Sequence, residues 1–192
     1  MRRRICTLLA ALTLSAVATP VLAKPLVHEI YSGTDTFSVD DVCGTDWSVD
    51  VTFNGNFMLK AGRSGDPTPY FFDNYNYVEV WTDVNDPTRM VVHKGNALYK
   101  DLRITLVEGT TYHFQAIEAG QPSTWWTVDG DPIFRDRGSI IWEFTVDTLG
   151  DDNLDNDIFV SEDGPTSIRG PHPELVSTEQ EFCAAITGAI DG

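Results

Sequence analysis

Alternating apolar and polar residues run through most of the chain and predict β-strands. In WSVDVTF, residues 47–53, the large apolar side chains lie on one face of a strand and the polar ones on the other. Asn54-Gly55 follows directly, and this pair readily takes positive φ at both positions. The pattern therefore predicts a hairpin that turns at Asn54-Gly55 and returns through residues 56–59.

The same alternation, broken by turn residues, predicts three more hairpins. Their turns lie at Asn85-Asp86-Pro87, at Glu108-Gly109 and at Asp129-Gly130. A strand over residues 139–146 and a short one around residues 158–160 follow these hairpins, and the fold as a whole is expected to have about nine strands. This spacing predicts an all-β fold, an antiparallel β-sandwich of the immunoglobulin-like or jelly-roll-like kind, with a closed β-barrel as the alternative.

One segment near the C-terminus has a helical pattern. Ser177 and Gln180 have the spacing of a capping box, and apolar residues follow at every fourth position. These are Phe182, Ile186 and Ile190. We therefore expect a short helix over about residues 177–190.

The N-terminus has the three parts of an export signal. Residues 1–4 are basic, residues 5–18 are mostly apolar, and Ala23 fits the small-residue rule for cleavage. The apolar run is short for a bilayer span. We expect cleavage after Ala23 and a single secreted, extracellular domain of residues 24–192 with no membrane span in its mature form. The alternative is a short core helix at the N-terminus.

The chain is strongly acidic. It carries 13 Lys and Arg against 29 Asp and Glu, a formal charge of −16, and loss of residues 1–23 with their three arginines makes this −19. Such a surface repels phosphate backbones, which argues against nucleic acid as a partner. A cationic partner fits this charge. The other interpretation is that the charge only keeps an exported protein in solution.

Two cysteines remain after the predicted cleavage, Cys43 and Cys183. They lie near opposite ends of the mature chain, in a compartment where thiols are oxidised. The sequence has no C-x-x-C pair and its four histidines are scattered, which argues against structural zinc. We therefore predict a Cys43–Cys183 disulfide that holds the C-terminal helix against the start of the β-domain.

The stretch DDNLDNDIFVSE, residues 151–162, has nearly the spacing of a twelve-residue calcium loop. Oxygen-bearing side chains stand at positions 1, 3, 5, 7 and 12 of that loop. These are Asp151, Asn153, Asp155, Asp157 and Glu162. Carboxylate and amide oxygens suit a hard cation, so Ca²⁺ is the one cofactor that the sequence suggests.

The surroundings of this stretch differ from those of an EF-hand. Asn156 stands where glycine makes the sharp turn, β-patterned residues precede the loop, and Gly164-Pro165 blocks a helix after it. Two interpretations stay open: a calcium site that stabilises the loop, or an acidic turn without metal.

Aromatic residues supply a second candidate site. Trp125 and Trp126 are adjacent in a predicted strand, so their side chains point to opposite faces and one of them is expected to face outward. Together with Tyr75, Tyr77 and Trp81 they would form a platform on which a sugar ring stacks. The alternative is ordinary core packing and cross-strand pairing.

Sequence motifs for catalysis are weak. Residues 62–66, GRSGD, miss the G-x-S-x-G elbow, and neither H-E-x-x-H nor a phosphate-binding loop occurs. Serine, histidine and carboxylate side chains are present, but no spacing selects a set. We therefore expect a non-enzymatic binding protein whose unknown extracellular ligand is a polysaccharide or a cationic partner. A carbohydrate-binding module and a secreted hydrolase are the alternatives.

Several segments resemble those of small secreted bacterial proteins of unknown function. They are an early Cys43-Gly44, a hairpin over Tyr99–Thr110, a strand exit over Phe144–Asp151 and a late Cys183-Ala184-Ala185. The resemblance covers most of the mature chain. It implies secretion and a β fold, and it implies no activity.

Overall fold

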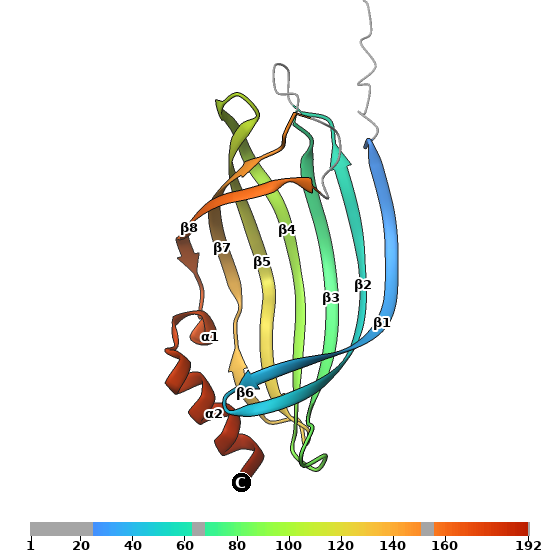
Figure 1. Ribbon diagram of the computed structural model, residues 1–192, viewed down its shortest axis with the longest axis vertical. Coiled ribbons are helices and arrows are strands. Elements are labelled where there is room, and N and C mark those ends of the chain that lie inside the picture. Colours follow the sequence, from blue (N-terminus) through green and yellow to red (C-terminus); the bar gives the residue numbers. More distant parts are fainter. Residues whose placement is uncertain (1–24, 63–67, 151–155, 192) are drawn as a thin grey trace, which may run out of the picture.

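The computed structural model describes residues 25–62, 68–150 and 156–191, so the predicted export signal lies outside it (Figure 1). The strands are β1 (Val27–Val42), β2 (Thr45–Lys60), β3 (Tyr70–Asp83), β4 (Met90–Glu108), β5 (Thr111–Thr127), β6 (Pro132–Arg135), β7 (Gly138–Asp147) and β8 (Ile158–Arg169). Two helices follow, α1 (Pro173–Val176) and α2 (Glu179–Asp191). In the described part of the chain, no helix has the length and apolar character needed to span a membrane.

All eight strands belong to one antiparallel sheet whose order follows the chain. The order is β1-β2-β3-β4-β5-β7-β8, and the short β6 pairs with β5 beside this path. Antiparallel neighbours can be joined by tight turns, so most residues from β1 to β8 lie in long strands and few lie in the connections. The predicted all-β class and the short C-terminal helix are confirmed.

The sheet curves so strongly that its two margins fold over its middle. In Figure 1 the turn ends of β1 and β2 bend across toward α2, and β8, which is paired with β7 from Ile158 onward, crosses the opposite end of the sheet. The register between β7 and β8 shifts at three places, and such irregularities bend a strand. One continuous sheet thus supplies facing layers and a concave inner face.

β2 differs from its prediction at Asn54-Gly55. The pair lies in the middle of the strand, opposite Ser32 and Tyr31 of β1, so the predicted hairpin at this position is wrong. Gly55 instead makes room for the Tyr31 ring, since a Cβ at Gly55 would lie 2.3 Å from the Tyr31 hydroxyl. The chain reverses earlier, at Cys43-Gly44, where both residues have positive φ, 57° and 74°.

The three later hairpins are confirmed, but within longer strands. The β3–β4, β4–β5 and β5–β6 turns fall at the predicted turn residues. β4 and β5 each merge two of the predicted strands, and the alternation pattern missed β1. Long strands suit the curved sheet because each one contributes to both of its ends.

The main buried cluster joins the sheet to α2. Its members are Trp47, Val49, Val91, Trp125, Phe134 and Ile186. Phe182 and Ile190 of α2 pack against this cluster, which confirms the predicted apolar stripe. The Cys43–Cys183 disulfide, with a Cα–Cα distance of 5.0 Å, joins the β1–β2 turn to α2 and is also confirmed.

The N-terminal cap of α2 lies one residue later than predicted. The Glu181 N–H donates to the Thr178 hydroxyl at 3.2 Å, and the Thr178 N–H donates to the Glu181 carboxylate at 2.9 Å. The predicted Ser177–Gln180 pair is wrong, because the Ser177 hydroxyl donates to the carbonyl of Pro173, the first residue of α1. A charged carboxylate also serves the positive end of a helix better than the Gln180 amide.

Candidate functional site

The strand register places one row of polar and aromatic side chains on the concave face. Glu79 of β3 is opposite His93 of β4, and His93 is opposite Trp125 of β5. Residues in such a row project on the same side of a sheet. Tyr77 lies two positions from Glu79 and therefore shares this face, opposite Gly95 of β4.

A bulge in β5 adds Ser123 to this row. Pro122 and Ser123 together oppose the single residue Gly95, which is the two-against-one arrangement of a bulge. The extra residue reverses the alternation along β5. Glu118 faces the concave side before the bulge, and the odd-numbered Ser123 and Trp125 face it afterwards.

A cavity of about 550 Å³ opens on the concave face between β3, β5, β7 and α1. It is lined by Tyr75, Tyr77, Glu118, Pro122, Ser123, Asp136, Ile140, Trp142, Glu174 and Leu175. Three aromatic rings, three carboxylates and the Ser123 hydroxyl therefore line the same cavity.

Two smaller cavities, each of about 300 Å³, continue along the same face toward β8. Trp142 lines both the large cavity and the next one, and Tyr99 and Phe144 line both smaller cavities. The remaining lining residues are Phe71, Asp101, Phe114, Val146, Asp157, Phe159 and Glu162. None of the described residues that line the three cavities is Lys or Arg.

Ser123, His93 and Glu79 form a connected polar set at the edge of the large cavity. The Nε2 atom of His93 lies 2.8 Å from the Ser123 hydroxyl, and its Nδ1 atom lies 2.8 Å from a Glu79 carboxylate oxygen. Trp125 stacks on the His93 ring with centroids 4.2 Å apart and planes 9° apart, which fixes the plane of the imidazole. Both ring nitrogens thus have defined partners.

Glu79 is held as a carboxylate by its donors. The same oxygen that contacts His93 also accepts the Trp81 indole N–H at 2.8 Å. Burial acts to raise the pKa of Glu79, but the hydrogen bonds from His93 and Trp81 and the charge of His93 outweigh it and lower the pKa below its usual value. A charged Glu79 favours the His93 tautomer that carries its proton on Nδ1.

Tyr77 and Glu174 complete the surroundings of Ser123. The Tyr77 hydroxyl donates to the Pro122 carbonyl at 2.9 Å and lies 2.9 Å from the Nε2 atom of His93. Burial, with the charges of nearby carboxylates, raises the pKa of Tyr77 well above its usual value. The Ser123 hydroxyl donates to the Glu174 carboxylate, so its proton has two acceptors within reach, Glu174 and His93.

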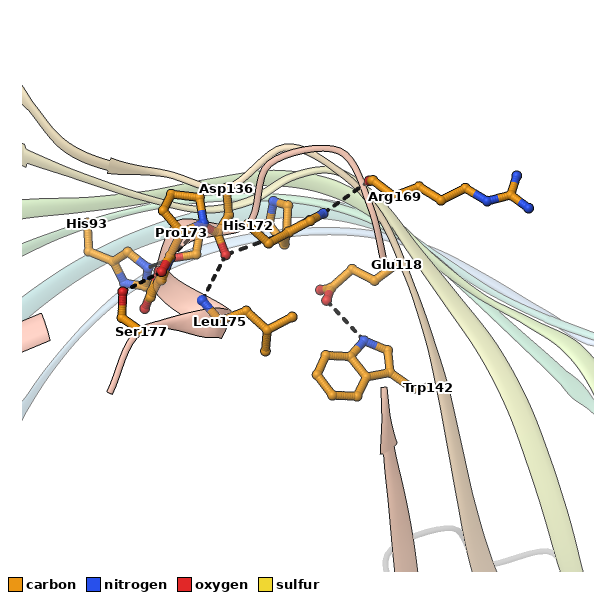
Figure 2. Close-up of polar contacts among 12 residues, drawn as sticks. His93, Glu118, Asp136, Trp142, Arg169, His172, Pro173, Leu175 and Ser177 are labelled. Atoms are coloured by element: carbon orange, nitrogen blue, oxygen red, sulfur yellow. Dashed lines mark hydrogen bonds and ion pairs between the residues drawn. The ribbon is translucent and has the colours of Figure 1, made fainter. Parts of the chain in front are cut away.

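Glu118 is the carboxylate that β5 supplies to the large cavity. Its carboxylate accepts the hydroxyl of Tyr75. It also accepts the indole N–H of Trp142 at 3.4 Å (Figure 2). Burial, followed by the hydrogen bond and the charge of Glu118, raises the pKa of Tyr75 well above its usual value. The two aromatic donors thus hold Glu118 in place beside the cavity.

Asp136 anchors α1 and so positions Glu174. Its carboxylate accepts the backbone N–H groups of Glu174 and Leu175 at 3.0 and 3.4 Å and lies 3.6 Å from the Nδ1 atom of His172 (Figure 2). The Asp136 and His172 side chains are 4% and 0% exposed. This buried pair ties α1 to the segment after β6 and places Glu174 over Ser123.

The predicted aromatic platform is divided between the two faces. Tyr75 and Tyr77 line the large cavity, while Trp81 and Trp125 pack edge to face within the core at a centroid distance of 5.3 Å. Trp126 faces the other side of the sheet, where Lys94 and Arg135 lie over its ring at 5.6 and 5.2 Å. The structure therefore brings together the two tyrosines at the cavity. It places Trp81 and Trp125 in the core and Trp126 on the opposite face of the sheet.

Most of the predicted calcium ligands cannot be placed. Asp151, Asn153 and Asp155 lie outside the described residues. Asp157 lines the third cavity, and Glu162, a residue of β8, lines the second. Among the residues that the structure describes, no group of three or more His, Cys, Asp or Glu side chains is arranged to hold a metal ion.

Sequence reasoning missed the set around His93. His93 and Ser123 are 30 residues apart and Glu79 precedes His93 by 14, so no local motif joins them. The one available signal in the sequence was Pro122, because a proline within a β-patterned stretch marks a bulge or an edge. No family model, curated protein or solved structure matches the chain.

Proposed function

We propose that the protein acts outside the cell as a binding protein for an organic cation with an apolar part. One observation carries this proposal: three adjoining cavities on the concave face are lined by aromatic rings and carboxylates, and no described lining residue is basic. A cation placed on such a wall gains from charge pairing and from the negative faces of aromatic rings. The predicted export signal and the disulfide support an extracellular location.

The two ends of the cavity system differ in chemistry. The large cavity presents Glu118 and Glu174 beside Tyr75, Tyr77 and Trp142. The smaller cavities are walled mainly by aromatic rings, with Phe114 and Phe144 stacked at 5.2 Å. The cationic head of a ligand belongs at the first end and an apolar chain along the second. Such a division of polar and apolar walls is usual for small-molecule sites.

Isothermal titration calorimetry with monomeric decyltrimethylammonium tests this assignment. We expect saturable binding of one ligand, weaker binding of tetramethylammonium because it lacks the chain, and no binding of decanoate because the carboxylates repel it. Bound ligand also stabilises the folded protein, by about 2.7 kcal/mol of unfolding free energy at a hundredfold excess over Kd, and therefore raises the melting temperature.

Two charge-neutralising variants and a matched control localise the site. Glu118→Gln and Glu174→Gln each remove one cavity charge and keep the side-chain shape. Each is therefore expected to weaken binding of the cation about tenfold. Glu108→Gln removes the same charge at the exposed tip of the β4–β5 hairpin and should leave Kd unchanged. Equal affinity for decanoate and for the ammonium ligand contradicts the proposal, as does an equal loss in all three variants.

A further inference from the structure

We propose that Ser123, His93 and Glu79 form the catalytic set of an esterase, with Ser123 as the nucleophile. The substrate class is a carboxylic ester that carries a cationic group. This choice of substrate rests on the proposed function, whereas the catalytic set rests on its own geometry. An ester bond near Ser123 leaves its cationic group beside Glu174 and Glu118 in the large cavity and its acyl chain along the aromatic walls.

The geometry of the three side chains carries the assignment. Acyl transfer by a serine needs a base within hydrogen-bond reach of the hydroxyl and a third group that orients the base. The distances from the His93 ring to the Ser123 hydroxyl and to the Glu79 carboxylate are each 2.8 Å. The His93 and Glu79 side chains are only 14% and 18% exposed, while Ser123 lines the large cavity where a substrate has access.

The tautomer of His93 has the orientation that this chemistry requires. The Glu79 carboxylate accepts the proton on Nδ1, which leaves the lone pair of Nε2 directed at the Ser123 hydroxyl. Stacking on Trp125 prevents the ring from turning out of this plane. Glu79 acts on the reaction through His93 and is therefore a positioning residue.

Glu174 makes the set sensitive to the charge of the substrate. In the free protein the Ser123 hydroxyl donates to Glu174, so its proton is turned away from His93. A cationic group on the ester pairs with Glu174, and the Ser123 proton then turns to Nε2 of His93. Esters with a cationic group should therefore react faster than neutral esters of the same acyl chain.

The reaction balances with water as the only co-reactant. The Ser123 oxygen bonds to the ester carbonyl carbon, its proton passes to Nε2 of His93, and the same proton then leaves with the alcohol as the carbon–oxygen bond of the ester breaks. Water attacks the resulting acyl-serine, gives its proton to His93, and releases the carboxylic acid as the proton returns to Ser123. The Tyr77 hydroxyl lies beside the same Nε2 atom and donates to the Pro122 carbonyl in the free protein; in the reaction its proton turns to the negative oxygen of each tetrahedral intermediate.

A fluorophosphonate reagent tests the nucleophile independently of any substrate. It should attach to the disulfide-bonded protein at one site, the peptide that contains Ser123, with loss of fluoride. Ser123→Ala and His93→Gln should abolish the labelling, and Ser38→Ala, an exposed serine of β1, should not change it. Absence of labelling of the folded wild-type protein, or labelling at another residue, overturns the proposal.

Ester hydrolysis tests the roles of the three residues. With a butyryl ester of a quaternary ammonium alcohol, Ser123→Ala should lose at least about a thousandfold in kcat/KM. Glu79→Gln should lower kcat with little change in KM, because it misorients His93 without touching the substrate. A variant that keeps wild-type hydrolysis without Ser123 contradicts the assignment.

The two proposals fail in different ways. If calorimetry shows the cation bound, with unchanged affinity in Ser123→Ala, and no ester is cleaved, the esterase proposal fails and the binding function stands. If a neutral butyryl ester is cleaved at Ser123 as fast as the cationic one, the catalytic set stands and the assignment of a cationic substrate fails.

Discussion

At the scale of single residues, the contact between Tyr77 and Gly95 shapes the site. The Tyr77 ring lies across Gly95, so that a Cβ on this glycine would be 2.1 Å from the ring and 2.5 Å from the Pro122 carbonyl oxygen. The glycine therefore allows the close approach by which the Tyr77 hydroxyl reaches both His93 and Pro122. The absence of a side chain at Gly95 thus determines where the Tyr77 ring lies.

Gly95→Ala is expected to destabilise the protein by about 1–3 kcal/mol, the usual cost of overpacking. The Tyr77 ring must move, and its contacts with His93 and Pro122 are lost. Gly188→Ala is the matched control: it has an open surrounding in α2 and should stabilise by about 0.5–1 kcal/mol through helix propensity. Urea unfolding checks both signs, and a Gly95→Ala variant as stable as the wild type contradicts the packing argument.

At the scale of elements, alternation predicted strands well and strand ends poorly. The hairpin turns of β3–β4, β4–β5 and β5–β6 could be predicted because their residues have strong turn preferences. Asn54-Gly55 has the same preference and yet lies in mid-strand, because tertiary pairing of Tyr31 over Gly55 outweighs the local preference. The bulge in β5 depends on cross-strand register, which is not a local property of the sequence.

The cap of α2 gives a prediction at this scale. Thr178→Ala removes the hydroxyl that accepts the Glu181 N–H, and it should cost about 1 kcal/mol of unfolding free energy. Thr178→Ser keeps an acceptor at the same position and should restore most of that stability. Thermal unfolding of the oxidised protein measures both variants. A larger loss in Gln180→Ala than in Thr178→Ala contradicts the observed cap.

The candidate site belongs to the scale of the whole molecule, which is why the sequence did not reveal it. Its parts come from β3, β4, β5 and α1, and they are brought together by cross-strand register, by the bulge in β5 and by the contact of Asp136 with the backbone of α1. The acidic composition did predict a cationic partner in general terms. Only the structure shows that several of the acids line cavities on the concave face, instead of lying on the outer surface alone.

Burial of Asp101 in this interior lowers the stability of the folded protein at neutral pH. Asp101 lines the third cavity among Phe71, Tyr99 and Phe114 and accepts the Phe71 N–H at 2.7 Å. Burial raises the pKa of Asp101 from 3.8 to about 6, against a lowering effect of that hydrogen bond. Between these two values the folded protein binds a proton that the unfolded chain does not, so the contribution of Asp101 to stability falls as pH rises from about 4 to about 6.

Asp101→Asn keeps the acceptor for Phe71 and removes the titration, so it should stabilise the protein above pH 6 and have little effect near pH 4. The difference in unfolding free energy between variant and wild type should therefore grow between these pH values and then level off. Asp129→Asn, in the exposed β5–β6 turn, changes the net charge equally and should show no such growth. Urea unfolding at several pH values measures the difference. A stability gain that shrinks as pH rises would mean that the folded protein favours the charged form of Asp101, and the cavity wall around it would then be more polar than its aromatic lining implies.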